Sequence, residues 1–130
     1  MPLVRITIRE GRSAEYKKAL LDGVHNALVK AFKIPEHDRT QMVQELAHEN
    51  FEAPPNKTEN ATVIEITAFR GRSLEAKSLL YRSLVDNLAK KPGIAPNDVT
   101  IILQEPPLEN WGIRGGKPAS EVSIGFKIDV

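Results

Sequence analysis

Hydrophobic and polar residues alternate at the start of the chain. Val4, Ile6 and Ile8 occupy every second position, and polar residues stand between them. Successive side chains of a strand point to opposite faces, so a period of two is typical of a strand with one buried face. The pattern predicts a strand over Leu3–Ile8.

A helix is predicted after this strand, because the apolar residues then recur at spacings of three and four. Ser13 is a candidate N-cap, and Glu15 suits the positive end of the helix dipole. Pro35 ends the periodic stretch, and a second strand is predicted over Thr40–Leu46. The apolar positions of the helix are Leu20, Leu21, Val24, Leu28, Ala31 and Phe32.

The whole pattern occurs twice. Residues 64–105 align with residues 4–45 without a gap, and Gly71-Arg72-Ser73 falls on Gly11-Arg12-Ser13. The second copy predicts a strand, a helix that begins at Ser73 and ends at Pro92-Gly93, and a last strand. An internal repeat indicates that each copy is one supersecondary unit. The two predicted strands of the second copy are Val63–Phe69 and Val99–Leu103.

Two βαβ copies predict an α/β fold (α+β in some classifications), with a four-stranded sheet and both helices on one face. We interpret residues 1–130 as a single domain of two repeats, about 2–46 and 62–105. The loop His48–Asn60 joins the copies. Val122–Val130 alternates again outside the repeat, so we predict a strand there, added to a sheet edge of this chain or of a neighbouring subunit.

No predicted element covers the second face of this sheet. Its residues include too many apolar side chains for a face that is exposed to water. A sheet with helices on one side usually buries its other side as well. We therefore expect other copies of the chain to cover it. The predicted face carries Arg5, Thr7, Val63, Glu65, Thr67, Phe69, Thr100 and Ile102.

Composition narrows the functional classes. Hydrophobic residues make up 41% and charged residues 27% of the 130 positions, as in ordinary globular domains. The net charge of +1 gives no reason to expect nucleic acid or a membrane as partner. The chain has no cysteine, no signal peptide pattern and no run of transmembrane length, so we expect a cytoplasmic protein. His25, His37 and His48 lack ligand spacing; we expect surface or capping roles for them, and neither metal nor cofactor.

Pro2 is the sharpest candidate for chemistry. A small second residue permits removal of the initiator methionine, which leaves a secondary amine at the chain terminus. The pKa of an α-amine is about 8 in model peptides, and nearby cations with a dry wall favour its neutral, basic form. The alternative is structural, since a proline can begin a strand at no cost in hydrogen bonds.

Arg70 and Arg72 are candidates for binding an anion. They flank Gly71 where the predicted third strand meets its helix, and the first copy has Glu10 in place of Arg70. The carboxyl end of such a strand and the amino end of its helix form the usual anion site of a βαβ unit. Two guanidinium groups there match a carboxylate, although a solvated turn is the alternative interpretation.

Asp38 and Trp111 remain open to two interpretations each. Asp38 recurs as Asp98 in the second copy, which favours an Asx turn before a strand. Its predicted place near the same end of the sheet also allows acid–base chemistry. Trp111, the only tryptophan, is either a core residue or one wall of a site.

Pro2 on the first strand of a duplicated βαβ chain resembles the tautomerase superfamily. Segments 31–39, Arg70-Gly71-Arg72-Ser73 and Asn110-Trp111-Gly112 look like its malonate semialdehyde decarboxylase branch. The resemblance implies a homotrimer and an enzyme without a cofactor that acts on a small carboxylate. It also implies that Pro2 is the acid–base group, that the arginine pair holds the substrate carboxylate, and that Asp38 assists proton transfer or activates water.

The chain departs from the decarboxylase pattern after Trp111. Arg114, Lys117 and Glu121 stand where the decarboxylase has an apolar wall, which favours a second carboxylate or a polar tail and makes Arg114 a candidate substrate contact. The leading interpretation is keto–enol tautomerisation of a small 2-oxo acid. The alternatives are a lyase of the decarboxylase or hydratase type, and a trimeric binding module without catalysis.

Overall fold

A computed structural model describes residues 2–130; the expected removal of Met1 lies outside the described residues. The predicted order of strand, helix and strand, repeated once, is confirmed, and boundaries differ by at most two residues. The main elements are β1 (Leu3–Arg9), α1 (Ala14–Phe32), β2 (Thr40–Leu46), β3 (Thr62–Thr67), α2 (Leu74–Lys90) and β4 (Val99–Gln104). A hairpin follows, formed by β5 (Gly112–Ile113) and β6 (Lys117–Pro118).

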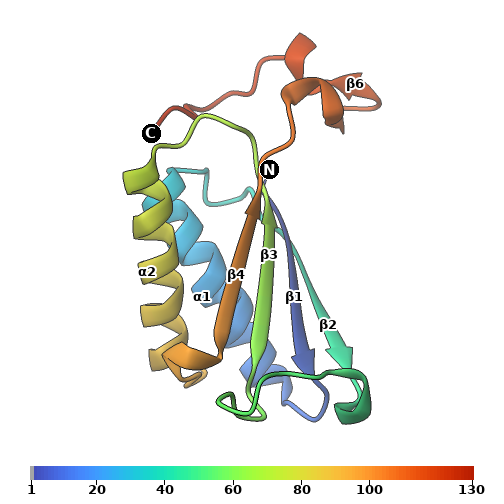
Figure 1. Cartoon of the computed structure of the whole chain (residues 1–130). Helices are drawn as coiled ribbons and strands as arrows, with labels where there is room; N and C mark the ends of the chain where they lie inside the picture. The colour runs from blue at the N-terminus through green and yellow to red at the C-terminus, as the bar shows by residue number, and fades with distance from the viewer. Residues whose placement is uncertain (1) are drawn as a thin grey trace.

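The sheet has the order β2-β1-β3-β4. Each copy contributes a parallel pair, and the copies meet at the centre, where β1 and β3 run antiparallel with Ile6 opposite Ile64. The two copies therefore run in opposite directions. As a result the beginning of β1, the beginning of β2 and the end of β3 lie at the same end of the sheet (Figure 1).

Both helices cover one face of the sheet, as predicted (Figure 1). Ser13 and Ser73 are the N-caps, and each side chain accepts the backbone N–H three residues on, at 3.1 Å. The predicted apolar faces meet in one buried core. Its largest fully buried members include Ile6, Ile64 and Ile66 of the sheet, Leu20 and Leu28 of α1, and Leu80, Leu84 and Leu88 of α2.

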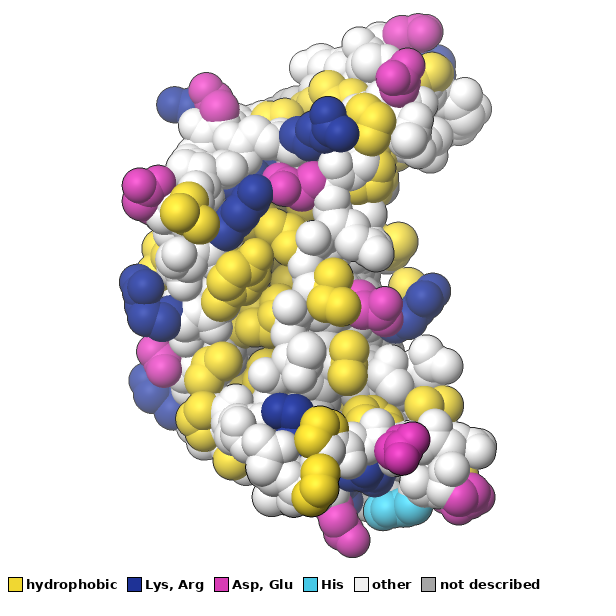
Figure 2. Space-filling model, in the orientation of Figure 1, with side chains coloured by type: hydrophobic (Ala, Val, Ile, Leu, Met, Phe, Trp, Pro, Cys, Tyr) yellow, Lys and Arg dark blue, Asp and Glu magenta, His cyan; other side chains and the backbone are white. Residues whose placement is uncertain are grey.

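No element of the described chain covers the opposite face of the sheet. Leu3, Met42 and Ile102 expose 37%, 42% and 47% of their surface there. The molecule is hollowed on this side, between the C-terminal region and the loop that joins the copies (Figures 1 and 2). The expectation that Phe69 needs another copy to cover it was wrong. Phe69 is the second residue after β3 and is 1% exposed, because Trp111 and Ala119 pack on it.

The predicted C-terminal strand is also wrong for the single chain. Residues 122–130 form no strand, although their side chains alternate between half-buried and exposed as the pattern indicated. Gly125 has a φ of +86°, which bends the backbone out of the extended conformation. The segment instead crosses toward α2, where the main-chain oxygen of Val130 accepts the N–H of Ser73 at 2.8 Å. Within residues 2–130, neither helix is long and apolar enough to cross a membrane.

Candidate functional site

Residues from distant parts of the sequence meet at one end of the sheet. Leu3 is paired with Thr40 on one side and with Thr67 on the other. Continued by one residue, this register sets Pro2 between Arg39 and Ala68. Pro2 is buried there. The loop after α1, the end of β3 and the C-terminal region all reach this end of the molecule (Figure 1).

A cavity of about 450 Å³ opens at this end. Its walls come from the loop between α1 and β2, from Phe69 just beyond β3 and from the C-terminal region. Apolar side chains form one side, and Asp38, Arg39 and Arg114 contribute charged groups. The lining residues are Pro35, His37, Asp38, Arg39, Thr40, Phe69, Ile113, Arg114, Ile124, Gly125 and Phe126.

Asp38 reaches the cavity because of a tight turn. Its N–H donates to the carbonyl of Pro35 at 3.0 Å, and the N–H of Arg39 donates to the carbonyl of His37, also at 3.0 Å. Asp38 is half-buried. The chain turns just before the strand, as expected, but both of these bonds are main-chain bonds. Asp38 lines the cavity, and its acid–base role stays a prediction.

Arg72 is buried, with 5% of its surface exposed. One terminal nitrogen, Nη1, donates to the carbonyl of Phe69 at 2.9 Å, and the guanidinium lies 4.7 Å from the centre of the Phe32 ring. Burial lowers the pKa of Arg72, and the nearby carboxylate of Glu105 opposes that shift. Nε and Nη2 have no hydrogen-bond partner among the described residues. Two buried donors without acceptors are costly, and a bound anion would satisfy them.

Arg70 lies in different surroundings. Its side chain is exposed, and its Nε donates to the carbonyl of Glu105 at 3.0 Å. Both arginines therefore follow the end of β3, but in the single chain one is buried and the other is exposed to solvent. Neither of them is among the residues that line the cavity.

The amino end of α2, where the sequence suggested an anion site, is partly filled by the chain itself. The oxygen of Val130 already accepts the N–H of Ser73. A Cβ at Gly71 would lie 3.2 Å from the carbonyl oxygen of Ile128, and the φ of Gly71 is +126°. Glycine is required at this position both for its backbone conformation and for the close approach of the C-terminal segment.

Trp111 forms the layer behind the cavity wall. It is 9% exposed, and its ring meets that of Phe69 edge to face with centroids 4.8 Å apart. Its Nε1 donates to the carbonyl of Pro106 at 3.4 Å. In the single chain Trp111 is therefore a core residue that supports Phe69. Arg114, by contrast, is exposed and lines the cavity directly.

Sequence reasoning missed two parts of this end of the molecule. The first is the apolar wall formed by Phe69, Ile124 and Phe126, although the alternation of residues 122–130 signalled burial on one side. The second is His25, for which a surface or capping role was expected. His25 is 1% exposed and sits beneath the loop that carries Asp38.

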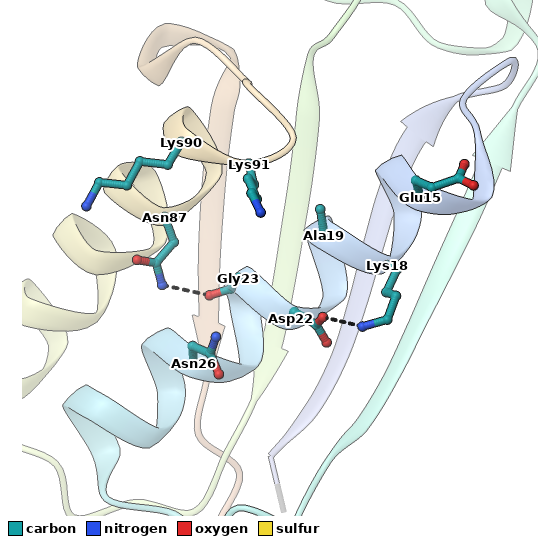
Figure 3. A pocket seen from close by; sticks show the side chains of 9 residues that line it. All are labelled: Glu15, Lys18, Ala19, Asp22, Gly23, Asn26, Asn87, Lys90 and Lys91. Carbon is teal, nitrogen blue, oxygen red and sulfur yellow. Dashed lines mark hydrogen bonds and ion pairs between the residues drawn. The ribbon is translucent and has the colours of Figure 1, made fainter.

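A second and larger groove, of about 670 Å³, runs between the helices on the outer face (Figure 3). Ala19 and Gly23 form its floor, and Asn87 donates to the carbonyl of Gly23 at 3.0 Å. Its rim is charged, and Lys18 pairs with Asp22 at 2.8 Å. It contains none of the predicted site residues. Over residues 2–130 no group of three His, Asp or Glu side chains is placed to hold a metal ion.

Comparison with known proteins agrees with this architecture. A sequence profile described as tautomerase enzyme matches residues 38–114, and a second with the same description matches residues 2–56. The chain belongs to the tautomerase superfamily. It is 34% identical to the probable tautomerase YrdN of Bacillus subtilis (strain 168), over 90% of this chain and 94% of that protein. Members of this family are tautomerases, which are isomerases, and the chain is therefore an enzyme of this class.

Solved structures of the superfamily share the fold. A malonate semialdehyde decarboxylase inhibited by 3-bromopropiolate is 28% identical, with a TM-score of 0.83 over 94% of this chain and 98% of that one. A fused 4-OT, described as an asymmetric trimer, is 25% identical, with a TM-score of 0.81 over 91% of this chain and 96% of that one. This tautomerase therefore resembles both the decarboxylase and the fused 4-OT in fold.

Proposed function

We propose that this tautomerase interconverts the keto and enol forms of a small 2-oxo acid, with Pro2 as the proton carrier and without a cofactor. The observation that carries the proposal is that Pro2 is buried at the same end of the sheet as the cavity that the Asp38 loop and Phe69 line. Their separation in the sequence makes that convergence informative.

Each group has a defined task in this mechanism. The neutral amine of Pro2 takes the proton of the enol hydroxyl, and the resulting ammonium delivers a proton to C3 of the substrate. Burial of Pro2 favours the neutral amine at rest. Arg72, with two unsatisfied donors, and Arg70 hold the substrate carboxylate, while Asp38 assists the proton transfer. Arg114 and Trp111 complete the substrate-binding wall, Arg114 by charge and Trp111 through Phe69.

We also propose that the chain works as a homotrimer. The exposed Leu3, Met42 and Ile102 need a partner, and other copies of the chain offer the complementary surface. The trimeric 4-OT with the same fold supports this arrangement.

Removal of the terminal amine tests the mechanism. Intact-mass measurement should show a protein that begins at Pro2, and Pro2→Ala should lose most of the ketonisation rate for a phenylpyruvate-type enol while its circular dichroism stays unchanged. The matched control is Thr62→Ala, since Thr62 is the buried counterpart of Pro2 in the second copy. Full activity of a protein that retains Met1, or of Pro2→Ala, would refute the proposal.

Decarboxylation of malonate semialdehyde is the second candidate. Two solved malonate semialdehyde decarboxylases, each 28% identical to this chain, favour it. Carbon dioxide release from malonate semialdehyde, measured beside the enol assay, separates the two activities. A kcat/KM at least about tenfold higher for one substrate, a difference of about 1.4 kcal/mol in transition-state binding, assigns the main reaction.

A further inference from the structure

His25 is a buried polar residue that the proposed chemistry does not use. Its Nε2 lies 2.8 Å from the carbonyl oxygen of Glu36, in the loop that carries Asp38. A carbonyl oxygen accepts and never donates, so Nε2 must carry the hydrogen of this bond. Nδ1 is buried and has no partner among the described residues. The only described hydrogen bond of this imidazole therefore holds the Asp38 loop.

Two other contacts bind this part of the chain to α1, one from the loop and one from the start of β2. Arg39 donates to Asp22 at 3.0 Å, and Gln41 donates to the carbonyl of Leu21 at 2.9 Å. The bond of His25 differs from that of Arg39 because its donor side chain is buried, although Glu36 itself lies at the surface. It reaches the loop two residues before Asp38, at the turn that sets the direction of the carboxylate.

The second copy has no equivalent of this anchor. Val85 stands in place of His25, and Pro96 in place of Glu36. The return loop of the second copy is held instead through Asp98, which accepts the N–H of Thr58 at 2.8 Å. The polar anchor from the helix is thus confined to the copy whose aspartate faces the cavity, and a general need of the βαβ unit does not explain it.

We propose that His25 is a positioning residue, which fixes the Asp38 carboxylate for catalysis by holding the carbonyl of Glu36. The catalytic part of this inference rests on the proposed function, whereas the structural part does not. Misplacement of a catalytic group by about 1 Å costs up to about 100-fold in rate, so a single loop anchor is enough to matter.

A pair of variants isolates the bond. In glutamine, Nε2 stands at the same number of bonds from Cα as Nε2 of histidine, so His25→Gln can reach the Glu36 carbonyl. Asparagine is one bond shorter, so His25→Asn leaves that carbonyl without its donor. The two variants are alike in polarity, which makes each the control of the other. Ile64→Val, a mild truncation elsewhere in the core, controls for a general loss of stability.

Two measurements on these variants decide whether His25 positions Asp38. Amide hydrogen exchange at Asp38 and Arg39 should become about tenfold faster in His25→Asn, as expected from the loss of one partly buried hydrogen bond, and stay near the parent value in His25→Gln and Ile64→Val. In steady-state assays kcat should fall about 10- to 100-fold in His25→Asn, with KM within about twofold, and recover in His25→Gln.

The outcomes separate this inference from the proposed function. Unchanged exchange at Asp38 and Arg39 in His25→Asn overturns the anchoring role, whatever the activity. Faster exchange without a change in kcat overturns the catalytic part while leaving the anchor. An active Pro2→Ala variant refutes the proline mechanism but leaves the anchoring role of His25 standing. The exchange experiment measures that role without any turnover. If His25→Asn does not fold, the exchange and kcat of His25→Gln still decide, and values far from the parent contradict the proposal.

Discussion

Asp38 and Asp98 occupy the same position in the two copies, yet their carboxylates have different surroundings. Asp98 is 2% exposed and accepts both the N–H and the hydroxyl of Thr58, whereas Asp38 is half-buried and lines the cavity. The antiparallel contact of β1 with β3 sends the two residues to opposite ends of the sheet. One aspartate closes the loop between the copies, and the other remains next to the cavity.

This difference predicts opposite effects of the same substitution. Asp98→Ala should lower the free energy of unfolding by roughly 2–4 kcal/mol, because it removes the two hydrogen bonds that the buried carboxylate accepts from Thr58, and should leave kcat of the folded enzyme near the parent value. Asp38→Ala should reduce kcat by about tenfold or more and cost under about 1 kcal/mol of stability. Urea titrations and steady-state kinetics of both variants check this; a reversed pattern would contradict the assignment of the two ends.

Arg72 should matter for catalysis while its counterpart in the first copy should not. Arg72→Ala should cost roughly 2–4 kcal/mol of transition-state stabilisation in kcat/KM, and Arg70→Ala a loss of the same kind. Arg72→Lys should restore only part of it, because an ammonium lacks the planar two-pronged geometry. Arg12, which bonds Asn60 at the other end of the sheet, supplies the control, and Arg12→Ala should keep the parent kcat/KM. Equal kcat/KM for Arg72→Ala and Arg12→Ala would show that Arg72 does not bind substrate.

The open sheet face should hold the trimer together. Ile102→Asp places a charge among the exposed apolar residues of this face and should shift the protein from trimer to monomer in light scattering at micromolar concentration. Leu74, 74% exposed at the start of α2, is the matched control, and Leu74→Asp should remain trimeric. A parent protein that is already monomeric would contradict the proposal directly.

Asp22 predicts a small dependence of stability on pH. Its pKa is lowered from 3.8, first by the hydrogen bond from Lys18 and then by that from Arg39. A carboxylate with a lowered pKa stabilises the fold above its unfolded value, and that stabilisation disappears as the pH falls through the folded value. Because Asp22 and its partners are largely exposed, Asp22→Asn should cost only about 0.2–1 kcal/mol at pH 6, and less at a pH below 3.8. Urea titrations of parent and variant at both pH values measure the difference; a difference that grows toward acid would reverse the sign.

Much of this architecture could be predicted because the signals are local and occur twice. Ser13 and Ser73 each precede an apolar helical stripe, and both are N-caps in the structure. The repeat also indicated which residues differ between the copies, and those differences point to the Pro2 end. Periodicity of two or of three to four reports burial on one side, and here it did so correctly.

The wrong expectations share one physical cause. Each depended on a contact between distant parts of the chain, which a local sequence pattern does not report. Alternation in residues 122–130 indicated which side chains are buried but carries no information about backbone pairing, so a packed segment was taken for a strand. Phe69 was assigned to the open face because nothing in the local pattern showed that Trp111 would cover it. His25 looked like a surface residue because its partner is a backbone carbonyl, which leaves no trace in the sequence.

The positions of Pro2 and Val130, the first and last residues that the structure describes, have a practical consequence. Pro2 and Val130 both lie at the cavity end of the sheet, the first by register and the second through its contact with Ser73 (Figure 1). An affinity tag at either end therefore stands beside the cavity, and one before Pro2 also blocks the amine. Because the chain has no cysteine, Asp86→Cys, in the C-terminal half of α2, provides a single thiol for immobilisation or dye attachment well away from both.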